Sequence, residues 1–335
     1  MSPPGNHWRI PVVFLTLCAI AGPGPVMAEA NWSSLTIDND LFVGNDNGYT
    51  SGLYYSWFDT PEKNKPEPGF LARVMLWSIS DGPAVAEVSI KTIGQSIVTP
   101  DDINLEDPPR PPDDLPYGGL LFYSDNWIRA YQSQAEKIGV TLGVVGEYSF
   151  AEETQKLVHK LLDGDDPQGW DTQLNDEIVF QLSHAQVWKS WTSSNGRSDI
   201  LLGTDASLGT ISSSVGATAM YRYGRQLQRS FATALLVTSR SANSMAMQAG
   251  WYLFAATNAS YLANQIFLDG NTFDNDGQKS MEYDNGTIGV TLGMAYAWPK
   301  FSLTFAISDL NVNKNNDSAA EYSEFGTLTL AWKHG

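Results

Sequence analysis

The sequence predicts an all-β fold, an antiparallel transmembrane β-barrel of about twelve strands with a short helix near its outer rim. Three observations lead to this fold. The chain begins with an export signal, no later apolar run is long enough for a spanning helix, and several segments alternate strictly between apolar and small residues. The 11 Trp and 14 Tyr often fall near the ends of the expected strands. A soluble β-sandwich shows similar alternation, but these aromatic positions favour the two interfaces of a membrane barrel.

Residues 1–28 are typical of a secretory signal peptide. An apolar run, 10–21, is followed by the small residues of a cleavage site at Val26-Met27-Ala28. Cys18, the only cysteine, lies inside this peptide, so thiol and disulfide chemistry are excluded from the exported chain. Because 29–335 contains no fixed repeat and no Pro- or Gly-rich linker, we expect it to form one barrel domain.

A hairpin near the C-terminus gives the clearest strand pattern. From 287 to 298, apolar residues occupy every second position and small residues the positions between them, and the alternation resumes over 301–307. Only Pro299-Lys300 separates the two runs, so the turn is very short. Trp298 and Phe301 flank that turn, where an interfacial aromatic girdle would lie.

Other strands have weaker patterns, and with the hairpin they bring the expected count to between twelve and fourteen. They are expected at 33–42, 50–58, 86–99, 117–132, 137–148, 175–190, 198–211, 214–226, 230–239, 246–258, 260–268 and 321–333. One segment, 151–162, breaks this rhythm with helix-forming residues, and an acidic turn follows it. The helix carries His159. A lone helical histidine is more often structural than catalytic, but acidic neighbours and a polar strand elsewhere favour a site here.

That polar strand lies near the start of the exported chain. Asp38, Asn39, Asp40 and Thr50 stand in otherwise β-forming sequence. Alternation places the face of Thr50 toward the lumen and the apolar face toward lipid. By the same count Asn39 points toward lipid while Asp38 and Asp40 point inward. Asn39 and Asp40 can share one site only if the strand bulges there or the pair lies beyond the apolar band. We predict such an irregularity, and a regular strand with Asn39 facing lipid would remove Asn39 from the site.

The charge of the chain restricts its partners. The formal net charge is −17, which argues against nucleic acid, since that partner requires clustered Lys and Arg. Most acidic residues fall in expected loops, where solvated loop tips are the simplest explanation. Acidic loops beside an anionic outer leaflet could also hold divalent cations, so calcium stays open as a ligand.

Several short motifs together resemble one known family. They are Asn39-Asp40, Tyr49-Thr50-Ser51-Gly52, Ile93-Gly94-Gln95, Pro116-Tyr117-Gly118-Gly119, and the stretch from Gly146 through His159 to Glu177. In order and spacing they resemble the outer-membrane lipid A deacylases. The resemblance covers the N-terminal half of the exported chain, and the C-terminal half is similar only in its barrel character. It implies a twelve-stranded barrel in the bacterial outer membrane, active near the outer rim.

The resemblance also implies an activity and a set of site residues. The family's activity is a calcium-dependent ester hydrolysis that removes the 3′-linked acyloxyacyl group of lipid A, the membrane anchor of lipopolysaccharide. Carried over by position, the site comprises His159, Asn39, Asp40, Thr50 and Asp165, with Asp40 and Asn39 as the calcium ligands. We expect a monomer surrounded by outer-membrane lipid.

This chain departs from the family pattern at several places. Asp165 stands where the family has Glu, so its carboxylate reaches less far. Leu115 replaces an Arg, which could weaken a contact to a lipid phosphate. Glu147 stands where a Pro is frequent, and Ala151 where a Gly is. None of the nominated catalytic positions carries an inert side chain.

Ester hydrolysis explains why these residue types would be needed together. It requires an activated nucleophile, a base and a positive group at the developing oxyanion. Unperturbed histidine side chains titrate at about pH 6.5 and can take a proton from water near neutrality. A carboxylate of Asp165 or Asp166 could fix the tautomer of His159. Calcium on Asp40, with Asn39 or a backbone carbonyl, could polarise the ester, since hard oxygen ligands suit that ion.

Two other functions remain open from the sequence. One is a phospholipase with Ser51 or Ser149 as nucleophile, although neither serine lies in a Gly-x-Ser-x-Gly elbow. The other is a non-catalytic barrel of the same ancestry, such as a porin or a structural protein. Ion conductance without lipid hydrolysis would identify that second alternative.

Overall fold

The structure is a computed structural model. It describes residues 32–39, 42, 49–60, 65–109, 111, 114–162, 164–231, 234–235, 249–273, 280–309 and 324–334. The predicted signal peptide and Asp40 lie outside these ranges, and the side chain of Thr50 is not described. No helix in the described part of the chain is long and apolar enough to cross a membrane.

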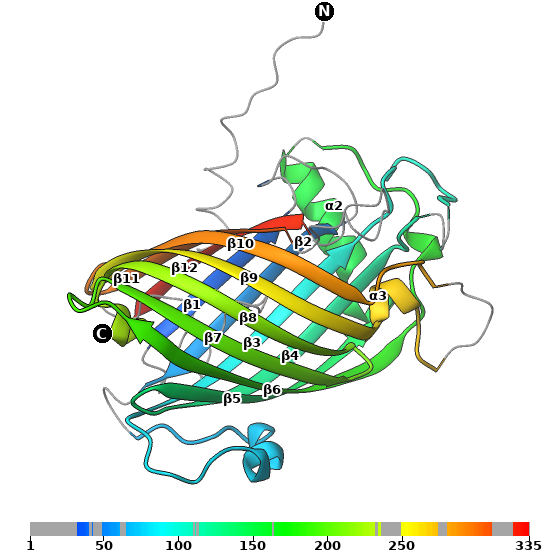
Figure 1. Cartoon of the computed structure of the whole chain (residues 1–335). Coiled ribbons are helices and arrows are strands. Elements are labelled where there is room, and N and C mark those ends of the chain that lie inside the picture. Colours follow the sequence, from blue (N-terminus) through cyan, green and yellow to red (C-terminus); the bar gives the residue numbers. More distant parts are fainter. Residues whose placement is uncertain are drawn as a thin grey trace, which may run out of the picture.

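The described strands form a closed antiparallel barrel. Each of the twelve strands pairs with its neighbours in sequence, and β1 pairs with β12 (Figure 1). The bounds are β1 Trp32–Asn39, β2 Tyr49–Asp59, β3 Ala86–Val98, β4 Gly118–Ala130, β5 Gln134–Val145, β6 Glu177–Thr192, β7 Ser198–Gly209, β8 Ser212–Arg225, β9 Gly250–Gln265, β10 Gly286–Ala297, β11 Phe301–Asp309 and β12 Glu324–Lys333. This architecture confirms the predicted fold class.

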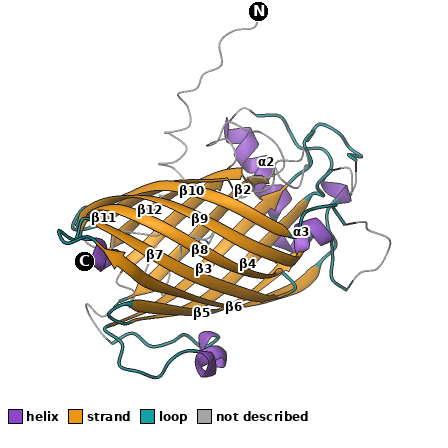
Figure 2. Cartoon of the chain, in the orientation of Figure 1, coloured by secondary structure: helices purple, strands orange, loops and turns teal. Residues whose placement is uncertain are grey.

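Within the described ranges, the helices lie in the connections between strands, as Figure 2 shows. They are the 3₁₀ helices η3 Ala72–Ser78, η4 Glu147–Ser149, η5 Trp170–Thr172 and η6 Leu227–Ser230, and the α-helices α2 Ala151–Leu162 and α3 Ile266–Asp269. The predicted helix at 151–162 is confirmed with the same bounds.

Two strand predictions were wrong. The strands expected at 246–258 and 260–268 are one continuous strand, β9. The strand expected at 230–239 is not present in its described residues: 230 ends η6, and 231 and 234–235 are turn or 3₁₀ backbone. The described residues of this segment are buried among inward-facing side chains, which explains why they are apolar. An apolar run alone does not distinguish a buried connection from a buried strand.

Two faces alternate along every strand. Ser56 on β2 is fully buried toward the lumen, while on β10 Leu292 and Met294 are 57% and 51% exposed toward lipid. Short connections at 131–133, 193–197 and 298–300 lie at the end that holds Trp32 and Lys333. Outer-membrane barrels have short periplasmic turns, so this is the periplasmic end, and α2 and α3 lie at the extracellular end (Figure 1).

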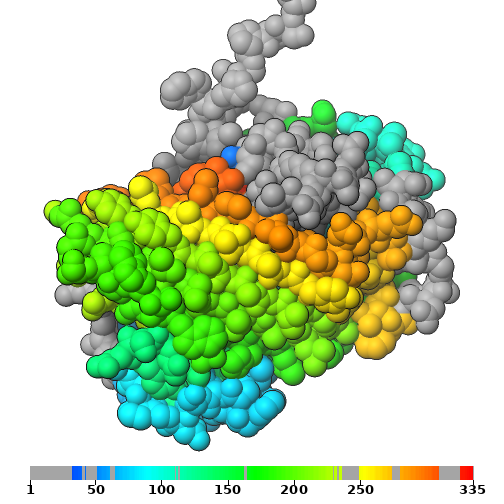
Figure 3. Space-filling view, in the orientation of Figure 1, coloured from blue at the N-terminus to red at the C-terminus, as the bar shows by residue number. Residues whose placement is uncertain are grey.

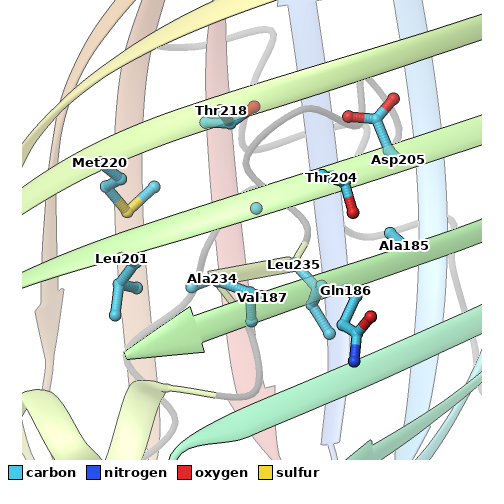
Figure 4. A pocket seen from close by; sticks show the side chains of 11 residues that line it. Ala185, Gln186, Val187, Leu201, Thr204, Asp205, Thr218, Met220, Ala234 and Leu235 are labelled. Carbon is cyan, nitrogen blue, oxygen red and sulfur yellow. The ribbon is translucent and has the colours of Figure 1, made fainter. Parts of the chain in front are cut away.

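The lumen is filled at its periplasmic end by the connection between β8 and β9. Leu227, Phe231, Ala234 and Leu235 are buried against inward-facing strand residues. A cavity of about 30 Å³, room for about two water molecules, lies beside Ala234 and Leu235 (Figure 4). It is too small for a lipid substrate.

The extracellular mouth is closed by a second cluster. Ile266, Phe267 and Leu268 of α3 pack with Met281, Val98 and other buried residues of the strand ends. Leu115 belongs to this cluster and is 1% exposed. Its side chain therefore packs in the mouth of the barrel.

A candidate active site on the outer wall of the barrel

The helix that carries His159 follows a tight turn after β5. Gly146 takes a φ of +88°, and an added Cβ would lie 2.6 Å from Oδ1 of Asp176, so this position favours glycine. Ser149 donates its Oγ–H to the carbonyl of Gly146 over 2.6 Å. Glu152 lies in the first turn of α2, where a negative charge suits the helix dipole, and pairs with Lys156 at 2.6 Å.

The start of α2 packs against the outside of the barrel. Ile97 and Gly119 are paired across β3 and β4, and by alternation they share the face of Ile93, which is 50% exposed toward lipid. An added Cβ on Gly119 would lie 2.2 Å from Cβ of Ala151. Gln95, on the same face, donates its Nε2–H to the carbonyl of Ser149 over 2.6 Å. The start of the helix therefore packs on the outer wall near the extracellular ends of β3 and β4.

Trp170 anchors the helix from the other side. Its side chain is 1% exposed, lies 4.9 Å from the ring of Tyr117 between centroids, and clusters with Ile97 and Ala151. Its Nε1–H donates to Oε1 of the buried Gln155 over 2.8 Å. Burial raises the pKa of Tyr117, so its hydroxyl stays neutral at physiological pH.

We expect Gln155→Leu to destabilise this anchor. The substitution removes the acceptor of the Trp170 indole N–H and leaves that donor buried, a loss of about 1–3 kcal/mol. Chemical unfolding in detergent measures the loss. Equal unfolding midpoints for wild type and Gln155→Leu would contradict the assigned hydrogen bond.

His159 lies near the C-terminal end of α2 with its ring partly exposed. Its Nδ1 lies 2.5 Å from the main-chain oxygen of Asp165. A carbonyl oxygen can only accept, so Nδ1 carries the proton and Nε2 of the neutral ring is the free acceptor. The acidic turn makes this contact by doubling back, because the amide of Gly164 also donates to the carbonyl of His159 over 2.9 Å.

The contact between Asp165 and His159 therefore uses the main chain. The sequence suggested that a carboxylate would orient the ring, and the shorter Asp side chain raised the question of reach. A main-chain oxygen accepts this hydrogen bond whatever the side chain at position 165, so the shorter reach of Asp does not affect it. The side chain of Asp165 is exposed.

Asn39 is the last residue of β1 and lies on the outward face of the wall. Its strand pairs in regular register with β12 through Asn39↔Gly326. The bulge expected at Asn39 is absent from this strand. Phe42 lies against the outer side of Gly326, where an added Cβ would meet it at 2.2 Å. Its ring centroid is 6.0 Å from that of the outward-facing Phe305.

The irregularity occurs on the neighbouring strand instead. The β2–β3 ladder pairs Tyr49 with Val98 and Ser51 with Ile97, so Thr50 is the extra residue of a β-bulge. Asp38 pairs with Gly52, so the next residue, Asn39, lies beside Ser51. Ser51 in turn pairs with Ile97, and the three residues form one row across the outward faces of β1, β2 and β3. That row leads across the wall to the residues on which α2 packs.

Asp38 and Tyr54 form a polar contact behind this row that sequence reasoning did not assign to the site. Asp38 is fully buried toward the lumen and accepts a hydrogen bond from the hydroxyl of Tyr54 over 3.2 Å. Gly52 leaves room for it, because an added Cβ would lie 2.1 Å from both the carboxylate and the hydroxyl. In the sequence, Gly52 among polar strand residues was the available indication that a neighbouring side chain needs this space.

The described residues include no group of three or more His, Cys, Asp or Glu that could hold a metal ion. Asp40, the main predicted ligand, lies outside the described residues, and of the predicted pair only Asn39 is placed. The amide oxygen of Asn39 and the carboxylate of Asp40 are hard oxygen donors, a set whose chemistry fits calcium.

Apolar side chains surround the helix on its exposed sides. Tyr148 and Phe150 are 66% and 57% exposed, and Leu157 and Leu161 are 57% and 53% exposed. Exposed apolar groups of this size are typical of a lipid-contact surface.

Comparisons with known proteins agree with this architecture. The model of a family described as "Outer membrane protein LpxR" matches residues 11–334. The structure of LpxR from Salmonella typhimurium superposes with a TM-score of 0.69 at 14% identity, covering 90% of this chain and 99% of that one. No curated protein matches at the sequence level.

Other solved barrels are more distant. The translocator domain of the autotransporter NalP from Neisseria meningitidis has a TM-score of 0.40 and 8% identity over 98% of this chain and 94% of that one. The KdgM porin has a TM-score of 0.38 and 4% identity over 91% and 99%. Because the family match spans nearly the whole chain and the barrel agrees with it, this protein belongs to the LpxR family of outer membrane proteins.

Proposed function

We propose that this protein is a lipid A deacylase that hydrolyses the ester of the 3′-linked acyloxyacyl group. The substrate would be lipid A or the lipopolysaccharide that carries it, taken directly from the outer leaflet by a monomeric barrel. The observation that carries the proposal is the placement of His159. Its ring is held by the carbonyl of Asp165, on a helix that packs against the outer wall at the extracellular rim.

The location supports a membrane-embedded substrate. A lipid ester that stays in its leaflet reaches a site on the outer wall without leaving the membrane, whereas a site in the lumen would require it to pass the barrel wall. The exposed Tyr148, Phe150, Leu157 and Leu161 supply apolar contacts for acyl chains.

The histidine geometry supports general-base catalysis. With its proton on Nδ1, His159 presents Nε2 to a water molecule and can accept a proton as that water attacks the ester carbonyl. The Asp165 carbonyl then stabilises the imidazolium and prevents the ring from rotating. The imidazolium then donates that proton to the sugar oxygen as the ester bond breaks, so the sugar leaves with a free hydroxyl and the acyl group leaves as a carboxylic acid.

Asn39, Asp40 and Thr50 are proposed to complete the site from the strand side. Asn39 and Asp40 would hold calcium, and calcium when bound supplies a Lewis acid that stabilises the developing oxyanion. The bulge at Thr50 falls in the row that contains Ser51 and Ile97. Bulges are frequent beside active sites because they re-aim the strand backbone.

Calcium removal tests this part of the proposal. Lipid A incubated with the purified protein in detergent is expected to lose one acyloxyacyl unit, detected by mass spectrometry, and a calcium chelator is expected to suppress the loss. Added calcium should restore it, while magnesium alone should restore less because it demands a smaller, near-octahedral site. Undiminished hydrolysis in the chelator would remove calcium from the proposal while leaving the histidine chemistry in place.

The porin alternative has less support. Leu227, Phe231 and Leu235 at one end of the lumen and α3 at the other pack against inward-facing strand residues, and a cavity of about 30 Å³ lies beside Leu235. Side chains packed inside the barrel in this way narrow the path open to ions. Planar-bilayer recordings with no conductance steps, together with lipid A hydrolysis, would set the porin aside.

The serine alternative also has less support. Ser149 is fully buried and donates its hydroxyl hydrogen to the carbonyl of Gly146, a role in the turn before α2. Ser51 lies on the outer face of β2 beside the bulge. A serine-directed phosphonate that abolished hydrolysis would favour this alternative over a histidine-activated water.

A further inference from the structure

A band of polar side chains interrupts the lipid-facing wall in its periplasmic half. Asp125, Arg129, Glu136 and Lys91 fall on the outward face of β3, β4 and β5, in the same alternation as the exposed Ile93 and Leu142. Charged groups on the lipid face of a barrel are destabilising near the midplane. These residues therefore require a cover.

The connection between β2 and β3 supplies that cover. Its described part, 65–85, includes η3 and lies outside the barrel along β4 and β5 (Figure 1; light blue at the bottom of Figure 3). The amides of Leu71 and Ala72 donate to Oδ2 of Asp125 over 2.9 and 3.3 Å. At the lower end, the amide and hydroxyl of Ser80 donate to the carboxylate of Glu136 over 2.9 and 2.8 Å.

An apolar contact lies between these two polar anchors. Ala72, Met75 and Ile79 are buried against Trp127, Ile138 and Val140 of the wall. The segment is thus fixed to the barrel by a small core of its own with carboxylates at either side. We call residues 65–85 the outer flap.

The opposite side of the outer flap exposes large apolar side chains beside the ion pair of Arg73 with Glu67, and the described chain does not cover it. Phe70 and Trp77 are 85% and 84% exposed, and Val74 is 64% exposed. The wall residues beneath the flap are polar. The exposed side of the flap therefore takes their place as the outer surface of the barrel in this region. Large exposed aromatic residues of this kind are enriched where a protein meets lipid headgroups.

The height of the outer flap agrees with that setting. Asp125 lies five residues from the periplasmic end of β4 at Ala130. At the rise and tilt of barrel strands this is about 12 Å along the barrel axis, within the lower half of an apolar band about 25 Å tall. The exposed face of the flap is continuous with the lipid-facing wall around Leu142.

We propose that the outer flap is a membrane-insertion element whose occupant is the phospholipid of the periplasmic leaflet, with Phe70, Val74 and Trp77 as the inserted side chains. The flap excludes lipid from Asp125 and Glu136 and returns an apolar surface to the bilayer. This role is independent of deacylation.

Cysteine labelling in lipid nanodiscs tests the proposal. In a Cys18→Ser background, Phe70→Cys and Trp77→Cys are each labelled with an environment-sensitive fluorophore. We expect blue-shifted emission and loss of fluorescence in brominated phospholipid, similar to Leu292→Cys on the lipid-facing wall. Ser194→Cys, in the exposed periplasmic turn after β6, is the aqueous control and should instead be quenched by iodide.

The outcomes are distinct. Iodide quenching of positions 70 and 77 at the level of the Ser194→Cys control would overturn the proposal. Lipid protection that appears only in nanodiscs holding two copies would also overturn it and identify a second copy of the chain as the occupant. Should either variant fail to fold, Val74→Cys repeats the test, and lipid A hydrolysis by each labelled variant confirms that the barrel is native.

Discussion

Replacing His159 by alanine is expected to lower the rate of lipid A deacylation by about 100- to 10,000-fold, the contribution typical of a general base. The barrel should remain folded because the ring is partly exposed and its polar contact is with the adjoining turn. Mass spectrometry of lipid A over time measures the rate. Unfolding of the purified barrel, compared with wild type, separates lost chemistry from lost structure.

Two controls sharpen this prediction. His184→Ala removes another partly exposed histidine, on the outward face of β6, and should leave the rate unchanged. Asp165→Ala keeps the main-chain oxygen that accepts from His159, so most of the activity should survive. A loss with Asp165→Ala as large as that with His159→Ala would show that the carboxylate acts directly. Full activity of His159→Ala would refute the proposed mechanism.

Replacing Asp199 by alanine is expected to cost about 3–5 kcal/mol of stability, because it leaves the charge of Arg222 buried without a counter-charge. Arg222 is fully buried in the lumen and pairs with Asp199 through two contacts, Nε to Oδ1 at 2.9 Å and Nη2 to Oδ2 at 2.7 Å. The same guanidinium donates to the carbonyl of Leu227 and the hydroxyl of Ser230 over 3.2 and 3.1 Å. The pair therefore also anchors the segment that fills the lumen.

Denaturant-induced unfolding in a lipid bilayer measures this effect. The matched control is Glu152→Ala, which breaks the partly exposed pair with Lys156 at 2.6 Å and should change stability by no more than about 1 kcal/mol. If the lumen segment loosens, Asp199→Ala should also show ion conductance that wild type lacks. Unchanged stability of Asp199→Ala would mean that water reaches Arg222 in the folded barrel.

The alternation of apolar and small residues was sufficient to predict the barrel and the hairpin after 287. Lipid imposes this pattern on each strand separately, so it can be recognised locally. The pattern failed at 230–239 because a segment buried in a lumen is also apolar. The alternation also failed to show that 246–258 and 260–268 belong to one strand, β9. Near their junction the residues on the two faces of β9 differ little in polarity.

The candidate site could be predicted only in part. The residue types and the helix at 151–162 follow from the sequence, whereas the side of the wall on which the helix packs does not. Counting from Leu35 places Asn39 outward and Asp40 inward. In the structure Asn39 lies on the outward face, the face on which α2 packs at Gly119 and Ile97, while Asp40 lies outside the described residues.

The sequence by itself determined the barrel class, the helix with His159 and the family resemblance, because each depends on short-range patterns. Only the tertiary structure decided that α2 stands outside the wall, that a main-chain oxygen of Asp165 holds the ring, that the lumen is plugged, and that an outer flap covers Asp125 and Glu136. These features join residues far apart in the chain. Strand alternation assigns a face to each residue, but it does not say which connecting segment will cover that face.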